Sequence, residues 1–256
     1  VWMVGLFAGA VILLYHRFAS TGFFGYDDLQ YAELAARWAG GNPDWSDHFS
    51  FRWSVTGLTA LAYTLLGIND LASSLPALLM ALATLVLLII ALRNHSPWII
   101  AGGAALFTLN HWSLFYAGKL MPDVHVAFFV TAAILIYYRM HRQGRVTTND
   151  QGSAGVNRDA RESGNGSTRK WHPFFLGIAF SLSLLGAFLA KETVILVVPL
   201  LVWWLLRDLY TRRRRRFWGA AILSGMLLLT GYFLLTAILT GDPGARWQAL
   251  LGNRYV

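Results

Sequence analysis

The sequence predicts an all-α polytopic membrane protein with about seven transmembrane helices and a helical first outer loop. Of its 256 residues, 56% are hydrophobic and only 13% are charged, and the mean hydropathy is +0.48. Soluble domains average about 25% charged residues, so this chain carries roughly half the charge that a water-facing surface needs. The chain contains no Cys, which excludes disulfides, thiolate metal sites and cysteine nucleophiles.

Seven stretches approach the length of about 20 mainly apolar residues that a membrane-crossing helix needs. They are residues 1–19, 71–92, 97–117, 124–140, 174–190, 193–206 and 217–240. An eighth apolar segment, Trp53–Leu66, would measure only about 21 Å as a helix, so we expect it to lie on the membrane surface or dip into it. Because the chain begins with Val1 and ends just after the seventh span, we also expect it to be part of a longer protein in which residues 1–256 form a single transmembrane domain.

The charge pattern predicts the orientation of these spans, since short cytoplasmic loops are enriched in Lys and Arg. With an inside N-terminus, the predicted inner loops and helix ends carry fourteen basic and four acidic residues, a net charge of +10. The outer segments, which include the long loop 20–70, then carry seven basic and nine acidic residues, a net charge of −2. Treating Trp53–Leu66 as a full crossing would reverse every later loop, so this partition favours the seven-span interpretation.

Two basic segments account for most of the inner charge. Residues 143–170 are rich in Gly, Ser, Asn, Thr and Arg, a composition that cannot bury a core, and we expect a flexible cytoplasmic loop there. On that side the glycosylation sequence at Asn165 would have no meaning. The run Arg212–Arg216 is expected to anchor a helix end beside anionic lipid headgroups, so membrane lipids rather than nucleic acid explain the net charge of +8.

The first outer loop contains a pair of carboxylates, Asp27 and Asp28, at the start of a helix predicted to run to about Ala39. One interpretation is structural: Asp27 is the N-cap and Gln30 completes a capping box. The other is functional: one of the two carboxylates is a base whose pKa is raised by low dielectric and by its neighbour. Adjacent helical residues point about 100° apart, so both interpretations can hold together.

Further ionisable residues collect at the predicted outer ends of the spans, where function is first sought in a membrane protein. Asp123 follows Pro122 at a helix N-terminus, where the helix dipole alone would favour a carboxylate, and His125 is expected to be a packed histidine. Lys191 is a cation that Glu192 could simply neutralise, but a cation there would also suit a lipid-linked phosphate. Arg52 and, more weakly, Lys119 are further cations of this kind.

Four segments between residues 20 and 200 share a common predicted side of the membrane: YDDLQYAE at 26–33, LGIND at 66–70 followed by SLPAL at 74–78, MPD at 121–123 and LAKE at 189–192. In these segments the chain resembles the family 39 glycosyltransferases, a class C membrane fold that includes protein O-mannosyltransferases and bacterial lipid A aminoarabinose transferases. The resemblance implies the fold of the N-terminal module of class C glycosyltransferases. It also implies inverting transfer of a sugar from a polyprenyl-phosphate donor to a lipid, glycan or protein acceptor, outside the bacterial inner membrane.

Residue roles follow from this resemblance and from the chemistry that the transfer needs. The acceptor hydroxyl needs a base, for which Asp27 is the first candidate and Asp28 the second, with Asp123 as a supporting carboxylate. The departing phosphate needs cations, and the expected substrate-binding residues are Tyr31, Arg52, Lys119, Lys191 and Glu192. No cofactor is required, and a divalent metal between Asp27 and Asp123 is allowed but not demanded. We expect Asp27, Arg52, Asp123 and Lys191 to converge on one outward cavity of roughly 300 Å³ or more.

The chain also departs from the family pattern. The family's acidic pair is often Asp-Glu rather than Asp27-Asp28, and Arg52 stands where the family has Lys. Family members also continue through further spans, which leaves acceptor recognition open. The alternatives are a non-catalytic membrane scaffold with the same fold, or a transporter, although transporters usually have polar midplane sites and repeated halves that this sequence lacks.

Overall fold

The computed structural model describes residues 2–19, 22–23, 25–152 and 172–252, and its regular elements in that part of the chain are all helices. They are α1 (Trp2–Ala19), α2 (Tyr26–Ala39), η1 (His48–Phe51), α3 (Thr56–Leu66), α4 (Asp70–Leu92), α5 (Pro97–Thr108), α6 (His111–Ala117), α7 (Pro122–Gly152), α8 (Pro173–Ala190), η2 (Glu192–Val197), α9 (Val198–Tyr210), α10 (Arg215–Thr240) and α11 (Ala245–Gly252). Residue 165, with its glycosylation sequence, lies outside the described residues.

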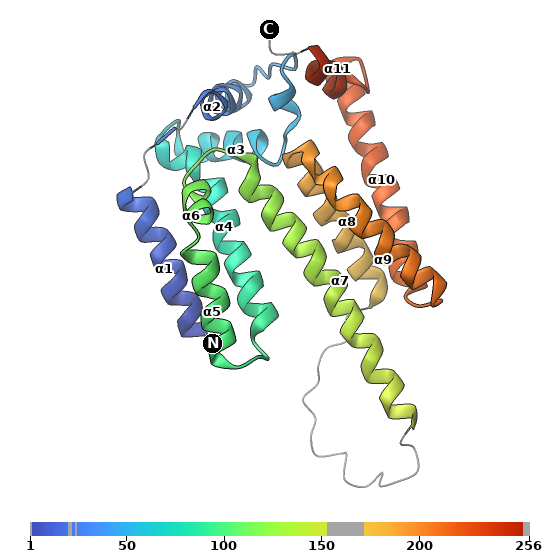
Figure 1. Ribbon diagram of the computed structural model, residues 1–256. Helices are drawn as coiled ribbons and strands as arrows, with labels where there is room; N and C mark the ends of the chain where they lie inside the picture. The colour runs from blue at the N-terminus through green and yellow to red at the C-terminus, as the bar shows by residue number, and fades with distance from the viewer. Residues whose placement is uncertain (1, 20–21, 24, 153–171, 253–256) are drawn as a thin grey trace.

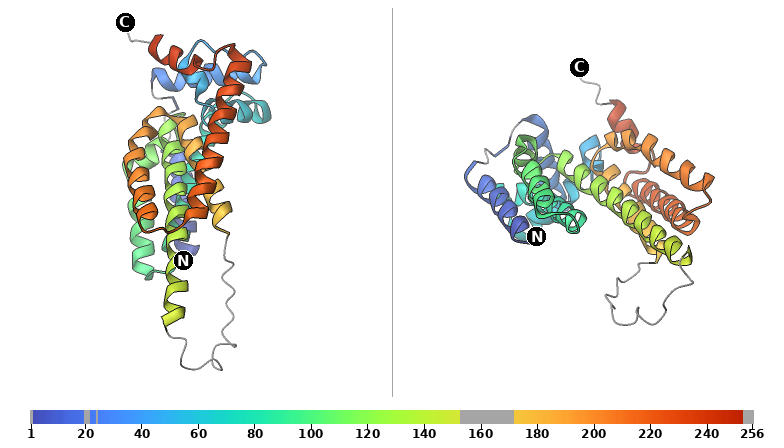
Figure 2. Two further views of the ribbon diagram at one scale, coloured as in Figure 1. Left: turned by 90° about the vertical axis from the view of Figure 1, so that its right-hand side faces the viewer. Right: turned by 60° about the horizontal axis from the view of Figure 1, so that its bottom comes forward.

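The long helices form two groups joined by α7 (Figure 1). One group contains α1, α4, α5 and α6, and the other contains α8, α9 and α10; α7 packs on α4 on one side and on α8 on the other (Figure 2). The helices α2, α3 and α11 gather at one end of the bundle, which we call the cap end. The turn between α9 and α10, with Arg212–Arg216, lies at the opposite end, which we call the arginine end.

Six of these segments are long and apolar enough to cross a membrane, which is consistent with an integral membrane protein. They are Trp2–Ala19, Asp70–Leu92, Pro122–His141, Pro173–Ala190, Glu192–Tyr210 and Arg215–Thr240. The expected span at 97–117 is instead divided into α5 and α6. The side chain of Asn110 accepts hydrogen bonds from the backbone N–H groups of Trp112 and Ser113, at 2.9 and 3.2 Å, and so caps a new helix within the apolar run.

The short apolar helix α3 crosses the ends of the neighbouring helices at the cap end rather than running parallel to them (Figure 1). It has 11 residues and ends at Gly67, whose φ of 76° lies in the left-handed region that favours glycine. This arrangement agrees with the expectation that Trp53–Leu66 does not cross the membrane.

Two expectations about the arginine end need correction. Helix α7 continues to Gly152, so residues 143–152 of the segment that was expected to be a flexible loop are helical, because extending an existing helix avoids the cost of nucleation. Residues 153–170 of that segment lie outside the described residues. In the run Arg212–Arg216, four side chains are exposed as a headgroup anchor requires, but Arg214 turns inward and forms an ion pair with the buried Asp208.

The cap end is attached to the bundle by an apolar cluster that fixes the position of the ionisable residues. Tyr31 and Leu34 from α2 and Phe49 from η1 pack with Leu120, before α7, and Ala190, at the end of α8. Tyr31 is fully buried in this cluster. The helical loop 20–70 therefore rests directly on the segments that carry Asp123 and Lys191.

Candidate active site at the cap end

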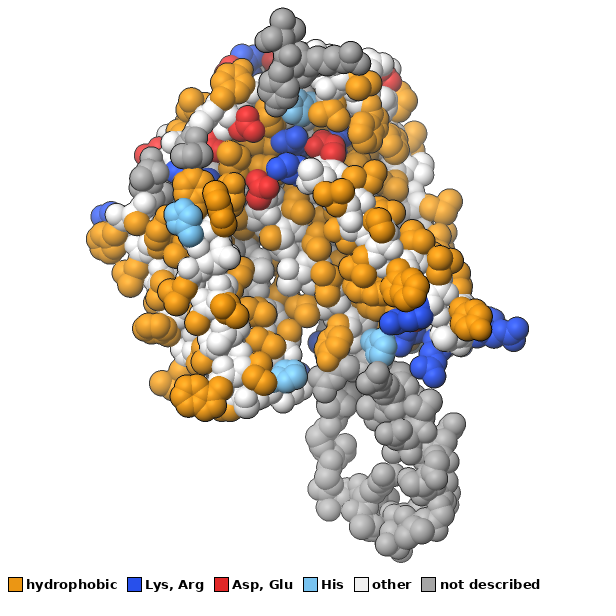
Figure 3. Space-filling view, in the orientation of Figure 1, with side chains coloured by type: hydrophobic (Ala, Val, Ile, Leu, Met, Phe, Trp, Pro, Cys, Tyr) orange, Lys and Arg blue, Asp and Glu red, His pale blue; other side chains and the backbone are white. Residues whose placement is uncertain are grey.

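The structure places all eight predicted site residues at the cap end, in four separate segments of the chain. Asp27, Asp28 and Tyr31 belong to α2, Arg52 follows η1, Lys119 and Asp123 flank the α6–α7 turn, and Lys191 and Glu192 join α8 to α9. In the space-filling view, acidic and basic side chains gather near this end in a largely hydrophobic surface (Figure 3).

Arg52 is one of the enclosed cations that were expected to bind phosphate. It is 8% exposed, and its guanidinium donates to the Tyr31 hydroxyl and, through Nη2, to Glu192 Oε2 at 3.1 Å. Burial lowers the pKa of Arg52, but Tyr31 and Glu192 outweigh burial and raise that pKa above its usual value. Burial likewise raises the pKa of Tyr31, so the site holds a charged guanidinium beside a protonated phenol.

A second arginine, Arg246 in α11, shares Glu192 with Arg52. Its Nε and Nη2 atoms lie 3.0 and 2.7 Å from Glu192 Oε1, and Nη2 also donates to the Phe188 carbonyl at 2.8 Å. Arg246 is 1% exposed, and its guanidinium lies 4.3 Å from the centre of the Phe188 ring. Two buried arginines therefore share one carboxylate, which leaves a surplus positive charge within this group of three.

Lys191 and Asp123 form the second ion pair of the site. The Lys191 Nζ atom lies 3.1 Å from Asp123 Oδ1, and the two side chains are 30% and 43% exposed. Lys191 has an extended backbone and ends α8, while Asp123 lies in the first turn of α7, where the helix dipole favours it. Such half-exposed pairs exchange partners at little cost.

Lys119 and Asp28 occupy a more closed environment than the sequence suggested. Lys119 is 2% exposed, donates to the Gly22 carbonyl, and lies 5.2 Å from the Phe115 ring centre. Burial lowers the pKa of Lys119, and the nearby carboxylate of Asp28 opposes this effect. Because Asp28 is fully buried whereas Asp27 is half-buried, Asp27 is the carboxylate of the pair that an acceptor can approach.

The capping interpretation of Asp27 is wrong. The N-cap of α2 is Gly25, without a side-chain hydrogen bond, and both carboxylates lie inside the first turn of the helix. Gln30 does not complete a capping box either, since its amide donates to the Asp47 carboxylate. Asp27 interacts electrostatically with Tyr31 and His48, which places it on the side of α2 that faces Arg52.

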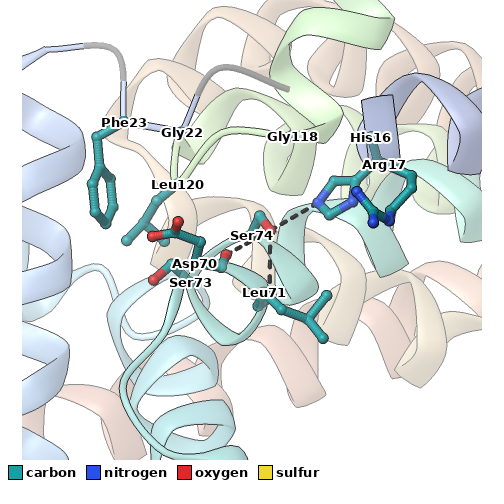
Figure 4. A pocket seen from close by; sticks show the side chains of 10 residues that line it. All are labelled: His16, Arg17, Gly22, Phe23, Asp70, Leu71, Ser73, Ser74, Gly118 and Leu120. Atoms are coloured by element: carbon teal, nitrogen blue, oxygen red, sulfur yellow. Dashed lines mark hydrogen bonds between the residues drawn. The ribbon is translucent and has the colours of Figure 1, made fainter. Parts of the chain in front are cut away.

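A cavity of 430 Å³ with several polar side chains in its lining lies between α1, the start of α4 and the α6–α7 turn (Figure 4). His16 and Arg17 from α1 face Asp70, Ser73 and Ser74 from α4, and His16 Nε2 lies 2.8 Å from the Ser74 hydroxyl oxygen. Gly118 and Leu120 line the same cavity and bracket Lys119 in the chain. The sequence analysis missed this cavity because its polar residues come from two spans far apart in the chain.

The expected convergence is therefore present in part. Direct contacts link Asp123 to Lys191 and Arg52 to the adjacent Glu192, and Asp27 interacts with Tyr31, the partner of Arg52. Asp123 lines a cavity of 160 Å³ with Thr84 and Tyr116, and a single larger cavity shared by Asp27, Arg52, Asp123 and Lys191 stays a prediction.

His125, two residues after Asp123, lies inside the protein. His125 is fully buried and its Nδ1 atom lies 3.3 Å from the Met121 carbonyl oxygen, in keeping with a packed histidine.

In the part of the chain that the structure describes, no three His, Asp or Glu side chains are grouped to hold a metal ion. Arg246 was missed as a site residue, although an arginine in the predicted outer segment 241–256 was a signal for it.

Comparisons of the chain with models of protein families, with curated proteins and with solved structures gave no match. The resemblance to family 39 glycosyltransferases therefore rests on the sequence segments quoted above, and function has to be argued from the site itself.

Proposed function

We propose that the chain transfers a sugar from a polyprenyl-phosphate donor to an acceptor at the cap end, which faces outward from a bacterial inner membrane. The observation that carries the proposal is the surplus positive charge of Arg52 and Arg246, which share Glu192, close to the accessible carboxylate of Asp27. A buried excess of cations suits a departing phosphate, and a nearby carboxylate suits an acceptor hydroxyl.

In the proposed reaction the Asp27 carboxylate takes the proton of the acceptor hydroxyl. The hydroxyl oxygen attacks the anomeric carbon from the face opposite the phosphate and forms the new glycosidic bond. The bond between the anomeric carbon and the phosphate oxygen breaks, and its electron pair leaves with the polyprenyl phosphate. The configuration at the anomeric carbon is therefore inverted.

Arg52 and Lys191 are the cations proposed to stabilise the leaving phosphate. Lys191 can turn from Asp123 to the phosphate, because the pair is half-exposed and such pairs contribute little stability. Lys119 is a poor candidate for this task, since it is enclosed and already donates to the Gly22 carbonyl. The 430 Å³ cavity beside Lys119, with its hydroxyl, imidazole and carboxylate groups, is the best place for a polar acceptor.

A non-catalytic scaffold is the second candidate, and one observation favours it. The three cations predicted from the sequence all have partners within the chain: Arg52 has Glu192, Lys191 has Asp123, and Lys119 has the Gly22 carbonyl. Such pairing would be sufficient if the cap end only held the bundle together.

A donor-consumption assay separates the two candidates. The protein in vesicles is given polyprenyl phosphates that carry labelled hexoses or pentoses, together with a membrane extract as the source of acceptor. A transferase releases free polyprenyl phosphate and moves the label to a product with inverted anomeric configuration. If the label stays on every donor of the panel, as in protein-free vesicles, the scaffold is the better account.

A further inference from the structure

An apolar crevice of 500 Å³ separates α9 from α8 and α10, and its lining extends from Trp218 to Phe188, the residue that Arg246 contacts at the cap end. Its walls include Phe180 and Leu184 from α8, Leu205 from α9, and Ile222 and Leu229 from α10. The polar groups at its edge are already used, since the Ser181 hydroxyl donates to the Ala221 carbonyl at 2.6 Å and the Trp218 indole donates to Asp208 at 3.0 Å. The crevice therefore offers nothing to a polar ligand and suits a hydrocarbon chain.

The polar contacts that hold α9 lie at its arginine end, and Trp204 in its middle stacks on Tyr137 with ring centres 4.2 Å apart. At the arginine end Asp208, 1% exposed, accepts hydrogen bonds from Tyr137 and Trp218, each at 3.0 Å, and pairs with Arg214. Above this attachment the residues of α9 are only partly covered: Val202 is 45% and Trp203 64% exposed. Helices α8 and α10 pack extensively on each other whereas α9 packs little on α10, which leaves an apolar gap beside α9.

The turn between α9 and α10, two of the helices that line this crevice, carries basic side chains. Arg212 and Arg214 have φ angles of 52° and 58°, a left-handed conformation that is costly for residues other than Gly. The Arg214 guanidinium pairs with Asp208, and this contact stabilises the turn. Arg212, Arg213, Arg215 and Arg216 stay exposed, and basic side chains gather at this end of the surface (Figure 3).

Among these exposed arginines, helical spacing places Arg215 on the face of α10 that lines the crevice. Positions 215, 218, 222 and 225 are three or four residues apart and share one face of α10, and Trp218, Ile222 and Gly225 line the crevice. Arg216 belongs to a different face, with Gly219 and Leu223, which are exposed away from the crevice. Arg215 thus lies at the polar end of an apolar channel.

We propose that this crevice binds one anionic diacyl phospholipid, with an acyl chain between α8, α9 and α10 and the phosphate on Arg215. Charge complementarity and the continuity of an apolar channel with a basic rim argue for this occupant. The phosphate position proposed at Arg215 begins α10 at the arginine end, so it is separate from the carboxylates and cations of the proposed sugar transfer.

The test measures lipid binding by native mass spectrometry of the detergent-solubilised protein, with phosphatidylglycerol and phosphatidylcholine of identical acyl chains as probes. Wild type retains more phosphatidylglycerol than phosphatidylcholine. Arg215→Gln weakens phosphatidylglycerol binding about fivefold, the effect of roughly 1 kcal/mol per arginine near an anionic headgroup. The matched Arg216→Gln control changes it less than twofold, and equal losses in both variants would overturn the proposal in favour of diffuse attraction.

A second pair of variants tests the acyl-chain part of the site. Gly225→Leu fills the crevice, and its new Cβ meets only ordinary contacts with Ser181, at 3.6 Å from Oγ, so the variant should fold. Val202→Phe fills the crevice from α9 and provides the same test should Gly225→Leu fail to fold. Each should abolish retention of phosphatidylglycerol, and unchanged retention in a folded variant would overturn the proposal.

Discussion

Each end of the bundle buries a carboxylate between two arginines, and the two arrangements differ in how far the arginines are enclosed. At the arginine end, Asp208 pairs with the buried Arg214 and, at 3.7 Å, with the partly exposed Arg207, and it accepts hydrogen bonds from Tyr137 and Trp218. At the cap end, Glu192 serves both Arg52 and Arg246. The first, closed arrangement joins α7, α9 and α10, and one of its arginines reaches solvent. At the cap end both arginines are buried, and the proposed phosphate binding rests on their surplus positive charge.

The largest expected effect comes from breaking the closed arrangement. Asp208→Ala should lower the free energy of unfolding by about 3–5 kcal/mol, because it leaves Arg214 buried without a counter-charge. Denaturant unfolding in detergent measures this loss. Asp208→Asn keeps an oxygen acceptor, so its free energy of unfolding should fall less. A change below about 1 kcal/mol for Asp208→Ala would show that Asp208 is not important for stability.

A smaller loss is expected at the cap end. Glu192→Gln should cost about 2 kcal/mol, since the Glu192 side chain is 17% exposed and the amide oxygen can still accept from Arg246. The same unfolding experiment compares it with Asp208→Ala. A loss larger than that of Asp208→Ala would mean that Glu192 is mainly a structural lock, contrary to the comparison.

The pair of Lys191 and Asp123 should contribute least to stability. A double-mutant cycle with Lys191→Met and Asp123→Asn should give a coupling energy below about 1 kcal/mol, because both side chains are partly exposed and screened. A coupling energy above about 2 kcal/mol would show that this pair, like Asp208, mainly stabilises the fold.

The pH dependence of stability tests the buried environment of His48 at the cap end. Burial, and then the nearby charge of Arg52, lower the pKa of His48 below 6.5. The unfolded chain therefore binds more protons than the folded chain between the folded pKa and about 6.5, so stability is complete above that pH and falls as the pH drops below it. Unfolding at several pH values measures this slope, which should be shallower in His48→Gln; an identical slope in that variant would contradict the assignment.

The apolar spans were predictable because apolar length is a local property of the chain. The break at Asn110 was missed since the apolar residues continue past it, although Asn before a short helical segment is an N-cap signal. The position of α3 across the bundle followed from its length and from the charge balance of the loops.

The partners of the charged residues were less predictable, because they depend on tertiary structure. Counting charges by side of the membrane treated Asp208 and Arg214 as parts of a basic surface, whereas the fold buries them together. Arg246 reaches Glu192 across 54 positions of the chain, and no local pattern encodes that contact. The prediction that Asp123 and Lys191 meet at the same end succeeded because it required only the topology.

The central claim, that the cap end carries out sugar transfer with Asp27 as the base, is tested most directly by comparing Asp27→Asn with Asp44→Asn in the donor-consumption assay. Asp44 is another carboxylate of the same loop, which pairs with Arg37 and accepts from Ser46. Removing a general base lowers rates by about 10²–10⁴-fold, so Asp27→Asn should lose transfer at least a hundredfold while its unfolding matches wild type, and Asp44→Asn should stay within about twofold. Wild-type transfer by a folded Asp27→Asn variant would contradict the account.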